Sequence, residues 1–127
     1  MKFYKMNAEN AKRVTQYNSN FLMNSFMHLN CELRISVMTL KGNGKIGFHQ
    51  TTTPQLLYLL EGEGVVCNED KKYYSVQKGI AVFWDHGEWH ETKSNQGLVA
   101  LIIEGFNISE DSILLDTLSS EALHCSD

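Results

Sequence analysis

Short segments rich in β-branched and aromatic residues, separated by turn-forming residues, fill the first 107 positions of this chain. Helical periodicity is nearly absent there, and this pattern is typical of an all-β sandwich or barrel. So many short strands in one flat sheet would leave long exposed edges, so we expect two packed sheets or a closed barrel. The expected strands lie near residues 11–17, 21–28, 32–40, 45–50, 55–61, 64–67, 72–77, 80–84, 89–94 and 98–104.

The breaks between these segments carry turn chemistry. Gly42-Asn43-Gly44 tolerates positive φ, Gly62-Glu63-Gly64 separates two apolar runs, and Asn68-Glu69-Asp70 predicts a polar hairpin turn. Nothing in the chain repeats at a fixed period, and no linker is visible. One domain is therefore expected.

Helical signals are confined to the two ends. Near the start, residues 7–11 predict a helical turn with Asn7 as its cap. Near the end, Ser109 precedes two acidic residues and the apolar run 113–118, which predicts a short capped amphipathic helix. We therefore divide the chain into a barrel domain, 1–107, and an acidic C-terminal helix or tail, 108–127.

Charge and length exclude several classes of protein. The 127 residues suffice for one core, and the net charge is −4. The segment 108–127 holds five acids and no base, so the other 107 residues have eleven bases against ten acids. Apart from Lys71-Lys72 the bases do not cluster, so we expect no nucleic-acid partner.

Apolar runs such as 56–60 and 98–103 are far shorter than the ~20 residues of a membrane span, so no membrane partner is expected. Met1 is not followed by an apolar stretch, which indicates no secretory signal and favours a cytoplasmic location. The three cysteines are widely spaced, without a C-x-x-C pair. This pattern predicts reduced thiols and neither a disulfide framework nor a zinc knuckle.

Between residues 44 and 94 the sequence resembles the two signature motifs of the cupin superfamily. In the first motif, about 44–64, His49 fits the first of two histidines and Thr51 stands where the second would be. Gln55 stands where the family has a glutamate, and Gly62 fits the closing glycine.

The second motif, about 79–94, runs from Gly79 through the turn Asp85-His86-Gly87 to His90. The resemblance implies a small single-domain cupin of an uncharacterised subgroup, whose fold is a double-stranded β-helix, or jelly-roll barrel. It also implies that His49, Gln55 and His90 occupy metal-ligand positions.

Two imidazoles and an amide oxygen suit a divalent ion such as Zn, Ni, Mn, Fe or Cu. Side chains alternate along a strand, so His49 and Thr51 share one face, and Glu88 and His90 share another. A neutral amide in place of a carboxylate predicts weaker binding and a more electrophilic ion. The alternative is an ion-free pocket in which His49, Gln55 and His90 hydrogen-bond one another or a buried water.

Other residues of the motifs have expected roles. Glu88 is the candidate general base or auxiliary ligand, and Thr51, Trp84 and Trp89 are candidate substrate-binding residues. For Trp84 and Trp89, core packing or a dimer contact is an equally good interpretation.

Together these features favour a metal-dependent cupin-type enzyme that acts on a small polar or anionic metabolite, with its reaction type open. A non-catalytic module that binds or senses a small molecule is the alternative, and a storage or structural protein is the third hypothesis. We also expect a homodimer, with residues 11–28 in the contact.

Overall fold

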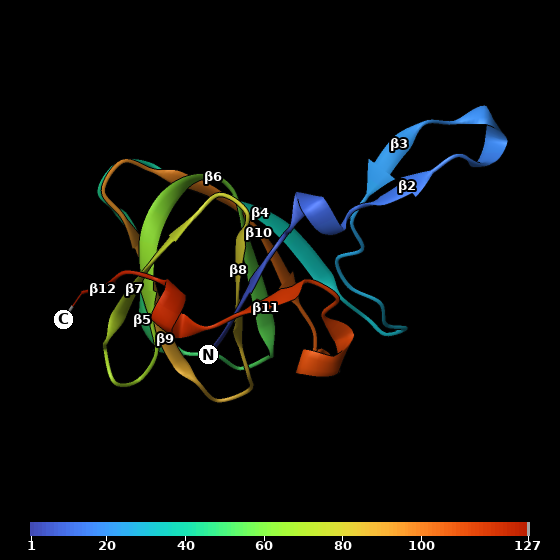
Figure 1. Ribbon diagram of the computed structural model, residues 1–127. Coiled ribbons are helices and arrows are strands. Elements are labelled where there is room, and N and C mark those ends of the chain that lie inside the picture. Colours follow the sequence, from blue (N-terminus) through green and yellow to red (C-terminus); the bar gives the residue numbers. More distant parts are fainter. Residues whose placement is uncertain (127) are drawn as a thin grey trace.

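The computed structural model describes residues 1–126, which form two β-sheets closed around an apolar interior (Figure 1). The all-β jelly roll expected from the sequence is confirmed. Its strands are β1 (Lys2–Lys5), β2 (Lys12–Val14), β3 (Phe21–Met23), β4 (Arg34–Leu40), β5 (Gly44–Gln50), β6 (Gln55–Cys67), β7 (Tyr73–Gln77), β8 (Ile80–Trp84), β9 (Trp89–Ser94), β10 (Leu98–Glu104), β11 (Asp116–Leu118) and β12 (Cys125–Ser126). Single 3-10 turns are η1 (Ala8–Asn10), η2 (Gln16–Asn18), η3 (Glu110–Ser112) and η4 (Ser120–Ala122).

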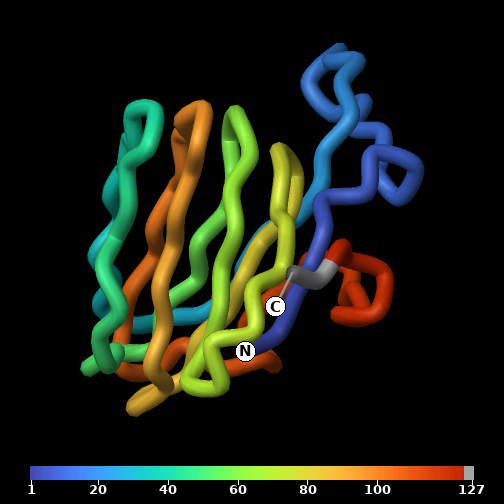
Figure 2. The backbone as a smooth tube through the Cα atoms, turned by 90° about the vertical axis from the view of Figure 1, so that its left-hand side faces the viewer, coloured from blue at the N-terminus to red at the C-terminus, as the bar shows by residue number. Residues whose placement is uncertain are grey.

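All strand pairs of the barrel are antiparallel, and β6 belongs to both sheets. Sheet one has the order β11-β1-β8-β6-β10-β4. Sheet two contains β12, β7, β6, β9 and β5 in that order. Figure 2 shows the hairpins standing side by side around the barrel. The long strand β6 therefore ties the two sheets together.

The bend that lets β6 change sheets lies at Gly62. The sequence predicts two strands separated by this glycine, but the structure has one strand of 13 residues. Gly62 has φ of +84°, and a Cβ there would lie 2.4 Å from the carbonyl oxygen of Gly97. Only glycine tolerates this conformation and this close approach, so the strand turns a corner without ending.

Alternation along the strands sorts apolar side chains into an inner and an outer cluster. On β6, Leu57 and Leu59 point into the barrel with Val82 and Trp84 of β8, whereas Leu56 points outward. The inner cluster comprises Phe3, Leu57, Leu59, Val66, Val76, Ile80, Val82, Trp84, Leu98, Ala100 and Ile102. The outer cluster comprises Tyr4, Leu56, Ala81, Phe83, Ile103, Ile108, Ile113 and Leu115.

The N-terminal segment differs from the prediction in two ways. The sequence predicts no strand at β1, which pairs with β8 and places Phe3 in the inner cluster. The expected strands 11–17 and 21–28 shrink to β2 and β3, which pair only with each other among the described strands. The cap is confirmed, because the Asn7 side chain accepts a hydrogen bond of 3.0 Å from the Glu9 backbone nitrogen.

The expected C-terminal helix is reduced to the single 3-10 turn η3, which begins after Ser109 as expected; the residues that follow lead into the strand β11, which pairs with β1. Ile113 and Leu115 are buried together, and their spacing of two is the period of a strand. Pairing with β1 thus outweighs the helical signal of the acidic first turn. In the part of the chain that the structure describes, no helix is long and apolar enough to cross a bilayer.

Candidate functional site

The pairing of β5 with β9 brings His49 opposite His90. Ile46 pairs with Thr92, but His49 pairs with His90, so β5 holds one more residue than β9 across this stretch. Such a β-bulge shifts the alternation by one position. It therefore directs His49 to the same side as Ile46, the side on which His90 faces the barrel interior.

The two rings meet through their ε nitrogens. Nε2 of His49 lies 3.2 Å from Nε2 of His90, and the ring centroids are 4.5 Å apart. The Nδ1 atom of His49 lies 2.6 Å from the carbonyl oxygen of Gly47, which can only accept. His49 therefore carries its proton on Nδ1, so its Nε2 lone pair accepts the Nε2–H of His90.

His90 occupies a dry position, whereas His49 reaches the surface. Only 4% of His90 is exposed, and the edge of its ring packs against Trp84 with centroids 4.4 Å apart. Burial, with a smaller contribution from the charge on His49, lowers the pKa of His90 to about 4. His90 is therefore neutral at physiological pH and keeps a lone pair available.

Two buried polar atoms have no hydrogen-bond partner, and one of them belongs to this pair. They are Nδ1 of His90 and Oδ1 of Asn68. The β6–β9 register ends with Val66 opposite Thr92 and Cys67 opposite Glu91; continued by one residue beyond the paired positions, it would place Asn68 opposite His90. Unpaired buried polar atoms are rare and costly, so they mark a place where a group is expected to bind.

Asn68 is a candidate for this site that the sequence pattern does not predict. Its position after a strand and before Glu69-Asp70 predicts only a turn. The signal that could have found it is the alternation of β6, because Val66 faces the interior and residue 68 has the same parity.

Gln55 and Thr51 are both buried near the start of β6. Gln55 pairs with Trp84 and has the parity of Leu57, so it lies on the interior face beside the tryptophan that touches His90. The Thr51 hydroxyl donates to the carbonyl oxygen of Thr53 at 2.7 Å. Gln55 thus borders the imidazole pair through Trp84, while Thr51 is held by the loop that precedes β6.

The two tryptophans lie on opposite sides of the barrel wall. Trp84 is fully buried, and its Nε1–H donates to the carbonyl oxygen of Cys67 at 3.3 Å. Trp89 faces outward and stacks on Phe48, with centroids 5.4 Å apart and planes inclined by 21°. Trp84 therefore forms the floor beneath His90, and Trp89 closes the outer surface of β5 and β9.

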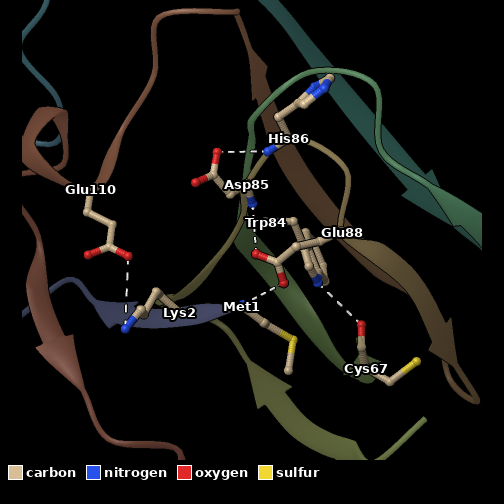
Figure 3. A network of polar contacts seen from close by, with 8 residues as sticks. All are labelled: Met1, Lys2, Cys67, Trp84, Asp85, His86, Glu88 and Glu110. Carbon is tan, nitrogen blue, oxygen red and sulfur yellow. Dashed lines mark hydrogen bonds and ion pairs between the residues drawn. The ribbon is translucent and has the colours of Figure 1, made fainter. Parts of the chain in front are cut away.

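Glu88 is held by neighbours other than the two imidazoles (Figure 3). One carboxylate oxygen lies 2.6 Å from the amino group of Met1, and the other accepts from the Asp85 backbone nitrogen at 3.0 Å. His86, in the same turn, is exposed, and its Nδ1 lies 2.8 Å from the carbonyl oxygen of Thr52. The turn is thus fixed by local contacts, and its role in chemistry stays a prediction.

The spacing of the two imidazole nitrogens is compatible with a divalent ion between them. Two nitrogens that each lie about 2.0–2.1 Å from one ion stand roughly 3.0–3.4 Å apart, which matches the separation in the imidazole pair. The Nδ1–H of His49 donates to a carbonyl, as the second nitrogen of a metal-bound histidine commonly does. Within residues 1–126, no group of three or more His, Cys, Asp or Glu side chains is placed to hold a metal. A third protein ligand would therefore come from another kind of donor, such as the amide expected at Gln55.

The family model of the cupin domain matches residues 36–104, which is more than half of the chain. The chain belongs to the cupin family. The expectation drawn from the two motifs is thereby confirmed at the level of fold and family.

Solved structures support the same architecture. A conserved protein of unknown function from Streptococcus pyogenes is 20% identical, with 64% of this chain and 70% of that chain covered and a TM-score of 0.55. An RmlC-like cupin from Shewanella frigidimarina is 19% identical, with coverage of 65% and 73% and a TM-score of 0.56. A DMSP lyase chain is 15% identical, with coverage of 57% and 37% and a TM-score of 0.52. No protein of curated function matches the chain.

Proposed function

We propose that this cupin is a metal-dependent enzyme for a small polar or anionic metabolite, with His49 and His90 as the ligands of a divalent ion. The observation that carries the proposal is the 3.2 Å approach of the two Nε2 atoms. Gln55 is the candidate third ligand, because its amide lies on the same interior face. Two imidazoles and an amide leave coordination positions open for water or substrate.

The chain's own residues would divide the work around the ion. His90 is kept neutral by burial, and the Gly47 carbonyl orients His49, so both Nε2 atoms can serve as ligands. With its Nε2 engaged, His90 would carry a proton on Nδ1, and the unpaired Oδ1 of Asn68 is a suitable acceptor. Ion binding would then give Nδ1 of His90 and Oδ1 of Asn68 a hydrogen bond to each other.

The expected class of substrate follows from charge. Imidazole and amide ligands carry no negative charge, so the ion would keep its full positive charge and attract an anionic or strongly polar group. When bound, the ion supplies Lewis-acid polarisation of such a group. The likeness to a DMSP lyase supports catalysis as a use of this fold, although the fold does not select the reaction.

The test is metal binding by purified protein without an affinity tag. Elemental analysis, followed by titration with Zn²⁺, Ni²⁺, Co²⁺ and Mn²⁺, is expected to give one ion per chain for the unmodified protein. His49→Ala and His90→Ala are expected to lose it, whereas His86→Ala should keep it because His86 lies in an exposed turn. Absence of binding below about 100 μM for every ion would reject the metal-dependent function.

A non-catalytic module that binds a small molecule is the second candidate. It is favoured by one observation: the Glu88 carboxylate is engaged by the Met1 amino group and by the Asp85 backbone, so it does not stand free for the role of general base expected of it. A thermal-shift screen of organic acids and sugars with metal present, followed by product analysis of each hit, separates the two. Turnover supports the enzyme, and stabilisation without turnover supports the binding module.

A further inference from the structure

The outer face of sheet one is covered over only part of its width. Phe26 packs edge-on against Tyr58 with centroids 4.8 Å apart, and Met27 forms a bridge with Ile113. These segments cover the side chains above β1, β8 and β6. Toward β10 and β4, apolar side chains continue on the same face.

Side chains that lie opposite one another on neighbouring strands form rows across this face, and their exposure rises along each row. One row runs from Leu56 through Ile103 to Ile35, and the exposed fraction rises from 0% to 6% and then to 59%. A neighbouring row runs from Tyr58 through Leu101 to Val37, which is 64% exposed. We call Ile35, Val37, Val99 and Leu101 the half-sheet patch.

The second unpartnered apolar feature is the arm, residues 12–23, which contains β2, η2 and β3. All three residues of β3 are exposed, with Phe21 at 48%, Leu22 at 58% and Met23 at 45%. An isolated two-stranded hairpin is marginally stable at best in water, so this apolar strand needs a partner surface. Figure 2 shows the arm at one margin of the barrel and the β4–β5 hairpin at the other.

We propose that the arm of one copy covers the half-sheet patch of a second copy, in a reciprocal exchange that forms a homodimer. A two-fold axis makes this contact twice, because each chain supplies one arm and one patch. The arm is an apolar strand in need of cover, and the patch continues a core cluster that the chain's own segments leave open.

Charge complementarity supports a second copy as the occupant. β2 adds Lys12 and Arg13 to the arm, and both are exposed. At the patch, Glu61 lies opposite Val99, and Glu32 precedes β4; both acids are exposed. The exposed bases Arg34 and Lys41 also border β4, so this rim carries charges of both signs. The two acids are the groups on it that the basic arm would meet, and such pairing gives specificity to an interface. β4 also pairs with β10 alone among the described strands, so its other edge is open.

The experiment measures association of the full chain by sedimentation velocity over about 1 to 100 μM. The unmodified protein is expected to be a dimer, and Leu22→Glu and Val37→Lys should each raise its dissociation constant at least about 30-fold. Gln77→Lys adds the same charge as Val37→Lys to an exposed strand position of sheet two and should leave association unchanged. Circular dichroism confirms that each variant is folded.

A mixing experiment tests which surfaces meet. In a mixed dimer of the Leu22→Glu and Val37→Lys chains, one arm–patch contact is unmodified and the other joins opposite charges. Mixing the two monomeric variants is therefore expected to restore dimers. A monomeric unmodified protein overturns the proposal, and so does a dimer that Leu22→Glu leaves intact, which would indicate patch-to-patch contact. Failure of the mixture to associate would likewise reject the exchange of arms.

Discussion

The imidazole pair and the arm are both incomplete, but in opposite senses. At the pair, polar atoms are buried without partners: Nδ1 of His90 and Oδ1 of Asn68 make no hydrogen bond. In the arm, apolar side chains stand in water without cover, with Leu22 more than half exposed. Both regions raise the free energy of the folded chain. Buried polar groups lose their hydrogen bonds to water, whereas exposed apolar groups remain in contact with water.

The two regions therefore need different kinds of partner. A dry polar site is completed by a group that supplies charge or hydrogen bonds, which is the chemistry of an ion with its ligand. An exposed apolar strand is completed by another apolar surface, which is the chemistry of a protein interface.

The largest effect is expected from Trp84→Ala, which removes the floor of the imidazole site. Trp84 is fully buried in the inner cluster, so the change should lower the free energy of unfolding by about 3–5 kcal/mol. Trp89→Ala is the matched control, and it should cost about 1 kcal/mol because its ring stacks on Phe48 at the surface. Urea denaturation measures both. Equal losses would mean that the two rings do not differ in structural role.

Acid is expected to destabilise the metal-free protein through His90. The unfolded chain takes up a proton at the ordinary pKa of 6.5, whereas the folded chain resists protonation until about pH 4. Protons therefore favour unfolding, and the contribution of His90 to stability is complete above pH 6.5 and falls by about 2–3 kcal/mol on going down to pH 4. Denaturation at a series of pH values, in the presence of a chelator, measures the slope of the free energy of unfolding against pH. His90→Gln should flatten it and His86→Gln should not; identical slopes in all three proteins would contradict the assignment.

Metal affinity is expected to change about tenfold when Oδ1 of Asn68, the second unpaired buried atom, is removed. Asn68→Leu should weaken Zn²⁺ or Ni²⁺ binding by about 10-fold, because its Oδ1 is the expected acceptor for the Nδ1–H of metal-bound His90. Isothermal titration compares this variant with Asn95→Leu, which changes a turn residue elsewhere. Asn68→Asp retains the acceptor and should bind at least as tightly as the unmodified protein. If all three bound alike, Asn68 would have no part in positioning His90.

The smallest effect on stability is expected from a substitution in the arm, measured at a protein concentration low enough to keep the chain monomeric. Leu22→Ser alters an exposed side chain, so the stability of the monomer should change by no more than about 0.5 kcal/mol. The melting temperature of the unmodified protein should rise with protein concentration, because dimerisation stabilises the folded state, and that of Leu22→Ser should not. Calorimetry over a range of concentrations measures both. A constant melting temperature for the unmodified protein would contradict the proposed dimer.

The sequence determined the architecture because strands and turns are encoded locally. Alternating apolar residues gave β6, β8 and β10 their inner and outer faces, and glycine at position 62 marked the corner of the barrel. The resemblance to the cupin motifs predicts that His49 and His90 are neighbours, and the structure brings their rings together. Their metal role stays a prediction.

The tertiary structure decided what depends on contacts between distant segments. The bulge before His49 exists only relative to β9, and the placement of Asn68 opposite His90 follows only from continuing the register of β6 against β9. Pairing with β1 turned an apparent helix into β11. A local pattern specifies which way a side chain points along its own strand, but only long-range pairing fixes what it meets and which surfaces are left without a partner.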